Sequence, residues 1–207
     1  MPGSSQDIQF QLVGGHPCLD LANTLDNRGS LNEINLIPSY EHLLHFAQQC
    51  GAFSAEDIRK LRSAAEAHRL KASDALTEAI LLRETIFQIF SAIANQKQPS
   101  QASLRHVNAF VTEAGGHRMV VPKAGGFSWR WDDIGTNPKA ALWPFAWKAA
   151  ELLASDDLAA VRECASPTCS WLFLDKSKSH SRRWCDMKVC GNRLKVRRFY
   201  ERTRAQG

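Results

Sequence analysis

The chain has 207 residues, 44% of them hydrophobic, which suffices for one ordinary domain, or one domain plus a small module, with a buried core. No apolar run reaches the length of about eighteen residues that a membrane helix needs. Residues 1–15 have no basic residue ahead of an apolar stretch, so they do not resemble a secretion signal. We therefore expect a cytoplasmic protein with no membrane partner.

The net charge of +5 is distributed unevenly along the chain. Residues 162–207 contain 12 Lys or Arg against 4 Asp or Glu, whereas residues 1–161 contain 14 against 17. A slightly acidic body with a strongly basic C-terminal segment indicates a polyanionic partner for that segment. A basic face that contacts only solvent is the alternative interpretation of the charge alone.

Apolar periodicity and capping residues predict a mostly helical body that follows a short arm with one strand at residues 8–13. The apolar stripe of the longest expected helix consists of Leu82, Ile86, Ile89, Phe90 and Ile93. The expected helices cover residues 18–25, a segment after the N-cap Ser39, residues 55–68 behind Ser54, residues 75–95 behind Ser73 and Asp74, and residues 101–113, where Gly115-Gly116 ends the helical run.

The second half of the body begins with a predicted β-hairpin. Residues 118–122 and 127–131 are two short strand-like runs joined by a turn that contains Gly125-Gly126. Alternation along the second run places Phe127, Trp129 and Trp131 on one face. A last body helix over residues 138–154 contains Pro144, which predicts a kink or a late start.

Four cysteines cluster within the basic segment, in the spacing Cys-x4-Cys-x15-Cys-x4-Cys. Two close pairs of thiolates are the ligands of a structural, tetrahedral Zn²⁺ site. A catalytic zinc would need an open position, and four unrelated thiols would not be spaced in pairs, so both are less favoured. An iron–sulfur cluster remains the alternative metal centre. The predicted ligands are Cys164, Cys169, Cys185 and Cys190.

The order of elements around these cysteines is that of a treble-clef finger. A strand over residues 170–175 leaves the first pair, and residues 176–181 form a polar loop that contains His180. Arg183-Trp184 is expected to return as the second strand, with Trp184 packed against the metal turn. A basic helix opens after Cys190 and continues to about residue 204.

This basic helix, with the loop before it, is the predicted nucleic-acid surface. Its cations flank a stripe of apolar residues, an arrangement suited to docking on phosphates with one face free to contact bases. Double-stranded DNA is the expected partner, with RNA or another protein as alternatives. A single finger covers few base pairs, so a homodimer is expected. The candidate residues are Lys178, Arg182, Arg183, Arg193, Lys195, Arg197, Arg198 and Arg202.

In the body, one side of the first predicted helix carries a row of polar residues. We interpret the row, with two nearby arginines, as the lining of a small-molecule effector pocket or, more simply, as a polar network between helices. Arg83 lies near an apolar helix face and is expected to meet Asp20 or another carboxylate. Cys18 is expected to be a buried, inert thiol. The candidate residues are Asp20, Asn23, Thr24, Arg28 and Arg83.

The sequence contains no nucleophile elbow, no glycine-rich phosphate loop and no HExxH motif, so we do not expect an enzyme. The fold class predicted from all these patterns is mainly α (α+β). A helical domain with a small hairpin occupies residues 1–160, and the treble-clef-like zinc finger occupies residues 161–207.

The segment Cys185-Asp-Met-Lys-Val-Cys190-Gly-Asn-Arg193 resembles the CGNR zinc finger family. The segment from Gly15 to Thr24, with the sequence GHPCLDLANT, resembles the ABATE domain that accompanies this finger. The resemblance implies a bacterial, stress-induced transcription regulator in which the four cysteines named above bind zinc.

Overall fold

The computed structural model describes residues 9–192. Within this part of the chain, no helix combines the length and the apolar character needed to cross a membrane. The elements, in which η marks a 3-10 or π turn, are α1 (Pro17–Ala22), β1 (Leu25–Asp26), β2 (Ile34–Asn35), α2 (Tyr40–Gln49), α3 (Ala55–Ala67), α4 (Arg69–Ala94), α5 (Gln101–Gly116), β3 (Arg118–Lys123), β4 (Gly126–Trp131), η1 (Pro138–Leu142), α6 (Trp143–Leu153), η2 (Asp156–Ala160), β5 (Val161–Glu163), β6 (Leu172–Leu174) and η3 (Met187–Gly191).

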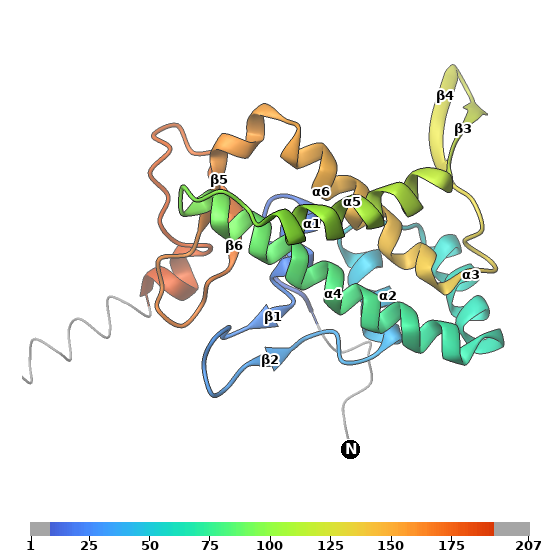
Figure 1. Cartoon of the computed structure of the whole chain (residues 1–207), viewed down its shortest axis with the longest axis horizontal. Coiled ribbons are helices and arrows are strands. Elements are labelled where there is room, and N and C mark those ends of the chain that lie inside the picture. The colour runs from blue at the N-terminus through green and yellow to red at the C-terminus, as the bar shows by residue number, and fades with distance from the viewer. Residues whose placement is uncertain (1–8, 193–207) are drawn as a thin grey trace, which may run out of the picture.

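The long helix α4 runs through the centre of the helical domain, with α1, α2, α3 and α5 packed around it (Figure 1). Its predicted stripe is confirmed, because Leu82, Ile86, Ile89 and Phe90 are fully buried. The helix nevertheless begins at Arg69, six residues before the predicted start at residue 75. Ser73 and Asp74 do not precede the helix, because Ala72 and Ala75 face the core while those two polar residues face solvent.

The capping residues Ser39 and Ser54 predicted the starts of α2 and α3 correctly. Ser39 accepts a hydrogen bond from the His42 backbone N–H at 3.4 Å, and Ser54 forms a capping box with Asp57. The predicted end of α5 was wrong, because this helix continues through Gly116. Each helical glycine costs roughly 1 kcal/mol, and packing of α5 against α6 offsets that cost.

The polar N-terminal segments differ from their predicted forms. Helix α1 ends at Ala22, short of residue 25, because the Asn23 side chain bonds to a distant strand and Leu25 pairs with Asn35 in β1–β2. The strand predicted at residues 8–13 is absent over residues 9–13. There, the N–H and C=O of Phe10 bond to the Gln49 side chain, so no partner strand is needed.

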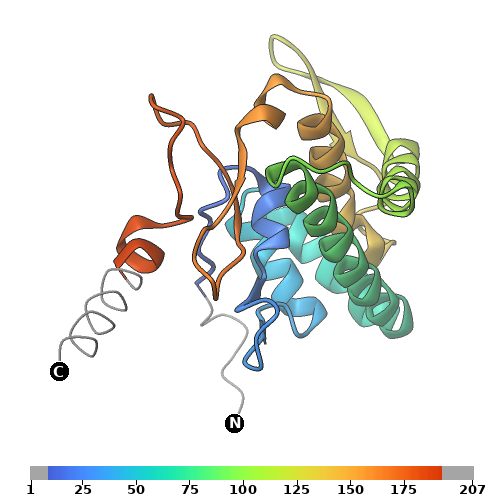
Figure 2. The same ribbon diagram turned by 60° about the vertical axis from the view of Figure 1, so that its left-hand side comes forward.

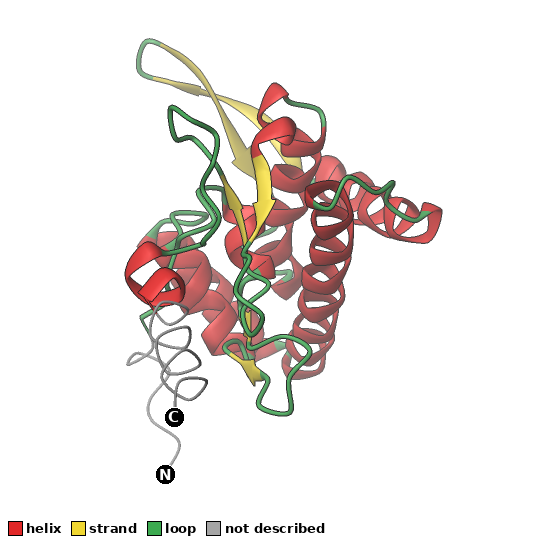
Figure 3. Cartoon of the chain, turned by 90° about the vertical axis from the view of Figure 1, so that its left-hand side faces the viewer, coloured by secondary structure: helices red, strands yellow, loops and turns green. Residues whose placement is uncertain are grey.

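The predicted hairpin is confirmed as β3–β4, with Val120 opposite Trp129, and it protrudes from the helical domain (Figure 3). Phe127 and Trp129 on its outer part are 70% and 60% exposed. The predicted effect of Pro144 is also confirmed as a late helix start. Pro138–Leu142 forms the 3-10 turn η1, and α6 begins only at Trp143, with Pro144 in its first turn.

Strand β6 pairs antiparallel with β5, which lies before the first cysteine. Arg183-Trp184 is not a strand, and that prediction was wrong. The reason is that the turn between Cys164 and Cys169 itself joins β5 to β6. In the described part of the finger, the segment around Arg183 is then held to the first turn by the backbone bond from the Ala165 N–H to the Arg183 C=O. Figure 2 shows the β5 and β6 strands in orange between the helices and the red η3 turn.

The side chains of β6 divide between two cores. Leu172 and Leu174 belong to the core of the helical domain, whereas Trp171 and Phe173 pack around the four cysteines. Because successive side chains of a strand point to opposite faces, one strand serves both cores. The boundary predicted at residues 160 and 161 therefore falls within a continuously packed region.

The free edge of β6 is occupied by the segment around α1. The Asn23 side chain donates to the Leu172 C=O at 2.9 Å and accepts from the Leu172 N–H at 2.8 Å. The Leu174 N–H donates to the Gly14 C=O at 2.9 Å. Gly14 has no room for a side chain, since a Cβ there would lie 2.8 Å from Asp20 Oδ1. This arrangement is named the Asn23 clamp below.

We predict that Asn23→Ala destabilises the whole protein, because it leaves the buried N–H and C=O of Leu172 without partners. The expected loss is about 2–6 kcal/mol of unfolding free energy, at about 1–3 kcal/mol for each of the two buried unsatisfied groups. Urea unfolding followed by far-ultraviolet circular dichroism measures it. The control is Asn108→Ala at an exposed position of α5, and equal stability of the two variants would contradict the clamp.

Candidate metal centre and neighbouring basic surface

The four predicted cysteines meet at one point in the structure. Their Sγ atoms all lie within 4.8 Å of one another, and each residue is 3–5% exposed. The Sγ atoms of Cys169 and Cys185 are 3.5 Å apart, and those of Cys185 and Cys190 are 3.6 Å apart. A disulfide requires about 2.05 Å, whereas thiolates bound tetrahedrally at about 2.3 Å from a metal lie roughly 3.8 Å apart. The spacing fits a metal ion.

The electrostatics of the four thiols also favour a bound cation. Hydrogen bonding to Cys164 raises the pKa of Cys169 and of Cys185, and burial raises the pKa of Cys190. Hydrogen bonds from Cys169 and Cys185 lower the pKa of Cys164. The close approach of the four sulfurs thus disfavours ionising all of them together. Four thiolates require a positive ion among them.

Each cysteine pair is positioned by a tight backbone turn. The Cys164 N–H bonds to the Trp171 C=O at 2.8 Å, which closes the first turn at the end of the β5–β6 ladder. In the second turn, Asp186 Oδ1 accepts from the N–H groups of Lys188 and Val189 at 2.6 and 3.0 Å. This cap begins η3, so Cys190 lies within the η3 turn near the end of the described residues.

The surroundings of the cysteines agree with the packing predicted for this module. Trp184 packs against the cysteine cluster together with Val13 from the N-terminal segment. Gly191 permits this packing, because a Cβ there would lie 3.1 Å from Trp184 Cδ1 and 2.4 Å from Met187 Sδ. His180 is a loop residue, with Nδ1 3.2 Å from the Asp175 C=O.

Asp175 organises the basic loop and was not recognised from the sequence. It is fully buried, and its carboxylate accepts from Ser177 Oγ at 2.6 Å, from the Ser177 N–H at 3.0 Å and from the Arg182 N–H at 2.9 Å. These hydrogen bonds, the Ser177 hydroxyl first, lower the pKa of Asp175. The Asp-x-Ser spacing is typical of an Asx-turn. This spacing is the sequence signal that could have identified Asp175.

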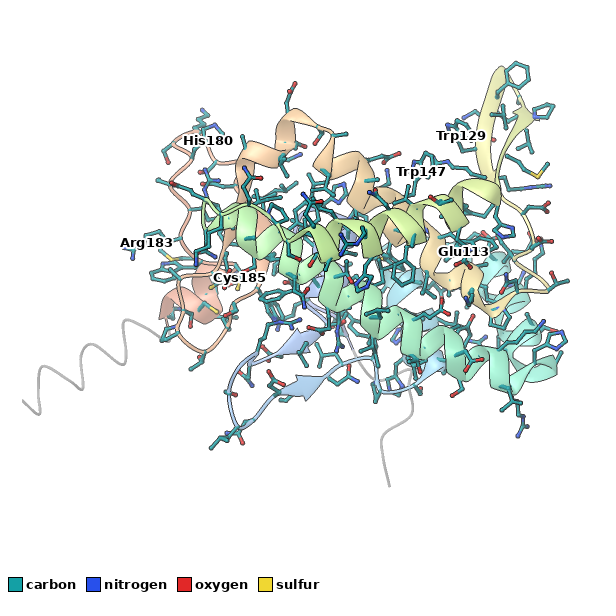
Figure 4. All side chains as sticks on the ribbon, viewed as in Figure 1. Glu113, Trp129, Trp147, His180, Arg183 and Cys185 are labelled. Atoms are coloured by element: carbon teal, nitrogen blue, oxygen red, sulfur yellow. The ribbon has the colours of Figure 1, made fainter. Side chains whose placement is uncertain are left out.

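The predicted loop cations have different environments. Lys178 and Arg183 are exposed, and Arg183 points away from the protein (Figure 4). Arg182 instead stabilises the finger, because its Nε donates to the Trp184 C=O at 2.9 Å, its Nη2 donates to the Cys185 C=O, and its guanidinium lies over Phe173. The remaining candidates lie outside the described residues: Arg193, Lys195, Arg197, Arg198 and Arg202.

The acidic residues of the finger that the structure describes all bind groups within the protein. Glu163 accepts from Ser91 Oγ at 2.6 Å and from Asn95 Nδ2 at 2.9 Å. Asp175 holds the basic loop and Asp186 caps η3, as described above. Their carboxylates are thus engaged by groups of the protein, whereas Lys178, Arg183 and Lys188 are exposed.

The polar residues of the helical domain form a bonded network, the simpler of the two interpretations. Arg83 is 4% exposed and bonds to Glu84 at 2.9 Å and to Asn35 at 2.7 Å, so its carboxylate partner is Glu84 and not Asp20. Arg28 also pairs with Glu84 and lies 3.8 Å from the ring centre of Phe87.

The polar residues of α1 and its C-terminal end are satisfied locally. Asp20 accepts from the Gly14 N–H at 2.8 Å, and Thr24 donates to the Leu21 C=O at 2.7 Å. Asn23 forms the clamp described above. Cys18 is fully buried, and burial raises the pKa of its thiol, which agrees with an inert core cysteine.

A helical domain joined to a treble-clef-like, four-cysteine module defines the class of this protein as a zinc-finger protein. Residues 15–156 match the ABATE family, described as "Putative stress-induced transcription regulator", and residues 160–203 match the CGNR zinc finger family. The chain belongs to the ABATE family and carries a CGNR zinc finger. No curated protein matches the chain.

We predict that Cys190→Ser lowers the bound metal from one equivalent to well below half and unfolds the finger, because a core this small cannot hold without the ion. Elemental analysis and limited proteolysis of residues 160–207 measure the two effects. Cys50→Ser, outside the cluster, is the control. Full metal content and protease resistance in Cys190→Ser would show that the cluster is not the metal site.

We predict a pH effect at Asp20. Burial raises its pKa to about 6 from an ordinary 3.8, so the folded state binds the proton more tightly than the unfolded state. Stability contributed by this group is present below pH 4 and is lost as the pH rises to 6. Asp20→Asn, which keeps an acceptor for Gly14, should therefore gain about 2–3 kcal/mol over the wild type at pH 7 and little at pH 4.

Urea unfolding at several pH values measures this difference. The control is Asp74→Asn at an exposed position of α4, for which the difference from wild type should not vary with pH. A difference between Asp20→Asn and wild type that stays constant from pH 4 to pH 7 contradicts the raised pKa.

Proposed function

We propose that this protein is a DNA-binding transcription regulator whose finger is folded around one Zn²⁺ ion. The observation that carries the proposal is the coincidence of the cysteine cluster with the basic segment. Residues 162–207 carry 12 Lys or Arg against 4 Asp or Glu, and three of those four acids bind inside the protein. The family description and the finger type support the same function.

Zinc is the proposed metal because four buried thiolates in two turns complete its tetrahedral coordination. With no open position for water, the ion would hold the two turns together and would supply no catalysis. The proposal therefore includes no enzymatic role for the finger. It includes none for the helical domain either, because the polar candidate residues there bond to backbone atoms and to other side chains, namely Asp20, Asn23, Thr24, Arg28 and Arg83. Elemental analysis and the absence of visible absorption distinguish zinc from an iron–sulfur cluster.

The proposed DNA surface consists of the exposed loop cations and the basic segment after Cys190. Lys178 and Arg183 lie on the outer side of the loop, and five further candidate cations follow in the sequence. Lysine and arginine bind phosphates without regard to base sequence, and base contacts add the selectivity. One finger contacts few base pairs, so we propose that two copies of the chain bind a target site together.

We predict that the protein binds duplex DNA with an affinity that falls steeply with salt, because each phosphate contact releases a counterion. The expected slope of log K against log salt concentration is about −0.9 per contact. The double variant Arg197→Ala and Arg198→Ala should weaken binding at least tenfold and reduce the slope by about 2. Fluorescence anisotropy of a labelled random duplex from 50 to 200 mM salt measures both.

The matched control replaces Arg59 and Arg105, two exposed arginines of the helical domain, with alanine and should leave affinity and slope unchanged. Both double variants should retain one equivalent of zinc. Absent binding, or binding that is flat with salt, rejects the proposal. Tighter binding to single-stranded or duplex RNA of the same sequence would indicate that the protein binds RNA and not DNA.

A further inference from the structure

A cavity of about 200 Å³ opens at the base of the β3–β4 hairpin, between the hairpin, α6 and the start of α1. It belongs to none of the sites described above. Its size is below the range of about 300–1,000 Å³ typical of drug-sized ligand sites, so it suits a compact molecule. The lining residues are Pro17, Gly51, Ala52, Arg118, Trp129, Arg130, Trp131, Pro144, Trp147 and Lys148.

Flat aromatic surfaces form much of the cavity wall. Trp129 and Trp131 come from β4, and Trp147 comes from α6; Trp129 and Trp147 are labelled in Figure 4. Trp129 is 60% exposed, which is costly for an indole ring in water. A flat ring stacked on Trp129 would cover this surface, since aromatic rings favour offset-stacked or edge-to-face partners.

Arg118 lies among these rings, and the described residues place no carboxylate within hydrogen-bond distance of its guanidinium. Its guanidinium carbon is 4.3 Å from the ring centre of Trp147, 4.8 Å from that of Trp129 and 5.0 Å from that of Trp131. Its side chain is 14% exposed, and its nearest carboxylate oxygen, on Glu151, is 4.0 Å away. Its buried Nε has no hydrogen-bond partner among the described residues.

The cavity as a whole has a positive charge. Arg118, Arg130 and Lys148 line it, and Glu151 is the acidic group beside it. That carboxylate is already engaged, since it accepts from Lys148 Nζ at 2.6 Å and from Trp147 Nε1 at 2.7 Å. Burial lowers the pKa of Arg118, which means that its charge is poorly solvated. A bound anion would stabilise that charge.

We propose that this cavity binds a compact planar anion of the aromatic carboxylate class. The ring would stack on the tryptophans, and the carboxylate would face Arg118, with Arg130 and Lys148 as the other cations that line the cavity. This places an effector site at the hairpin, away from the polar row of α1 where the sequence had suggested one.

The position of the cavity connects it to the finger. Pro17 begins α1, a helix of six residues, and Asn23, directly after its last residue, holds strand β6 by the clamp. A molecule in the cavity would therefore contact the same short helix that fixes the edge of the finger.

The test uses the full zinc-loaded chain and three probes. Benzoate is a planar anion, benzamide has the same shape without the charge, and cyclohexanecarboxylate has the charge without the flat ring. Saturation-transfer NMR and titration calorimetry measure binding without DNA, so the result is independent of the proposed DNA function. We expect saturable benzoate binding with a Kd on the order of 1 mM, appropriate for a ligand of about nine non-hydrogen atoms. Binding of the other two probes should be at least fivefold weaker.

Two variants locate the site. Arg118→Met should weaken benzoate binding at least tenfold, and Arg130→Met, at an exposed position, should weaken it about threefold while leaving the fold intact. Arg105→Met on α5 is the control and should bind as the wild type does, and melting temperatures report folding in each case. Equal binding of benzoate and benzamide, wild-type affinity in both cavity variants, or no saturable benzoate binding overturns the proposal.

Discussion

Strand β6 is the element on which the rest of the structure depends. One edge pairs with β5, and the other edge is held by Asn23 and Gly14. Leu172 and Leu174 anchor one face in the helical core, and burial of each contributes about 1.5–3 kcal/mol. The opposite face, with Trp171 and Phe173, supports the cysteines. The backbone pairing and the side-chain packing of this short strand thus hold the finger and the helical domain together.

The metal centre and the helical domain consequently depend on each other. Six buried residues form the core of the finger, too few to fold without either the ion or the strand that the helical domain holds. Each turn that presents a cysteine pair is short and backbone-bonded, so these turns fix where the Sγ atoms lie once the finger is folded. Because the turns are short, exposed Lys and Arg side chains occupy the outer surface of the finger.

The buried polar residues of the ABATE segment stabilise the fold, and the exposed charges are the ones that we propose for binding. Asp20, Asn23 and Arg83 are bonded internally, whereas Lys178 and Arg183 reach solvent. Arg118 is the intermediate case, because three tryptophans surround its cation and, over residues 9–192, no carboxylate lies closer than 4.0 Å. The two anion sites that we propose therefore use different cations, those of the finger for phosphates and Arg118 at the hairpin for a compact carboxylate.

The sequence alone determined what depends on local chemistry. Ser39 and Ser54 set helix starts, the glycine turn set the β3–β4 hairpin, and the paired cysteines set the metal centre, because spacing and capping act over a few residues. Only the tertiary structure decided what depends on distant partners. The partner of β6 is β5 and not Arg183-Trp184, α1 ends where Asn23 bonds to Leu172, 149 residues away, and Arg182 is committed to the finger. No periodicity encodes which backbone group a polar side chain meets, since long-range packing selects that partner.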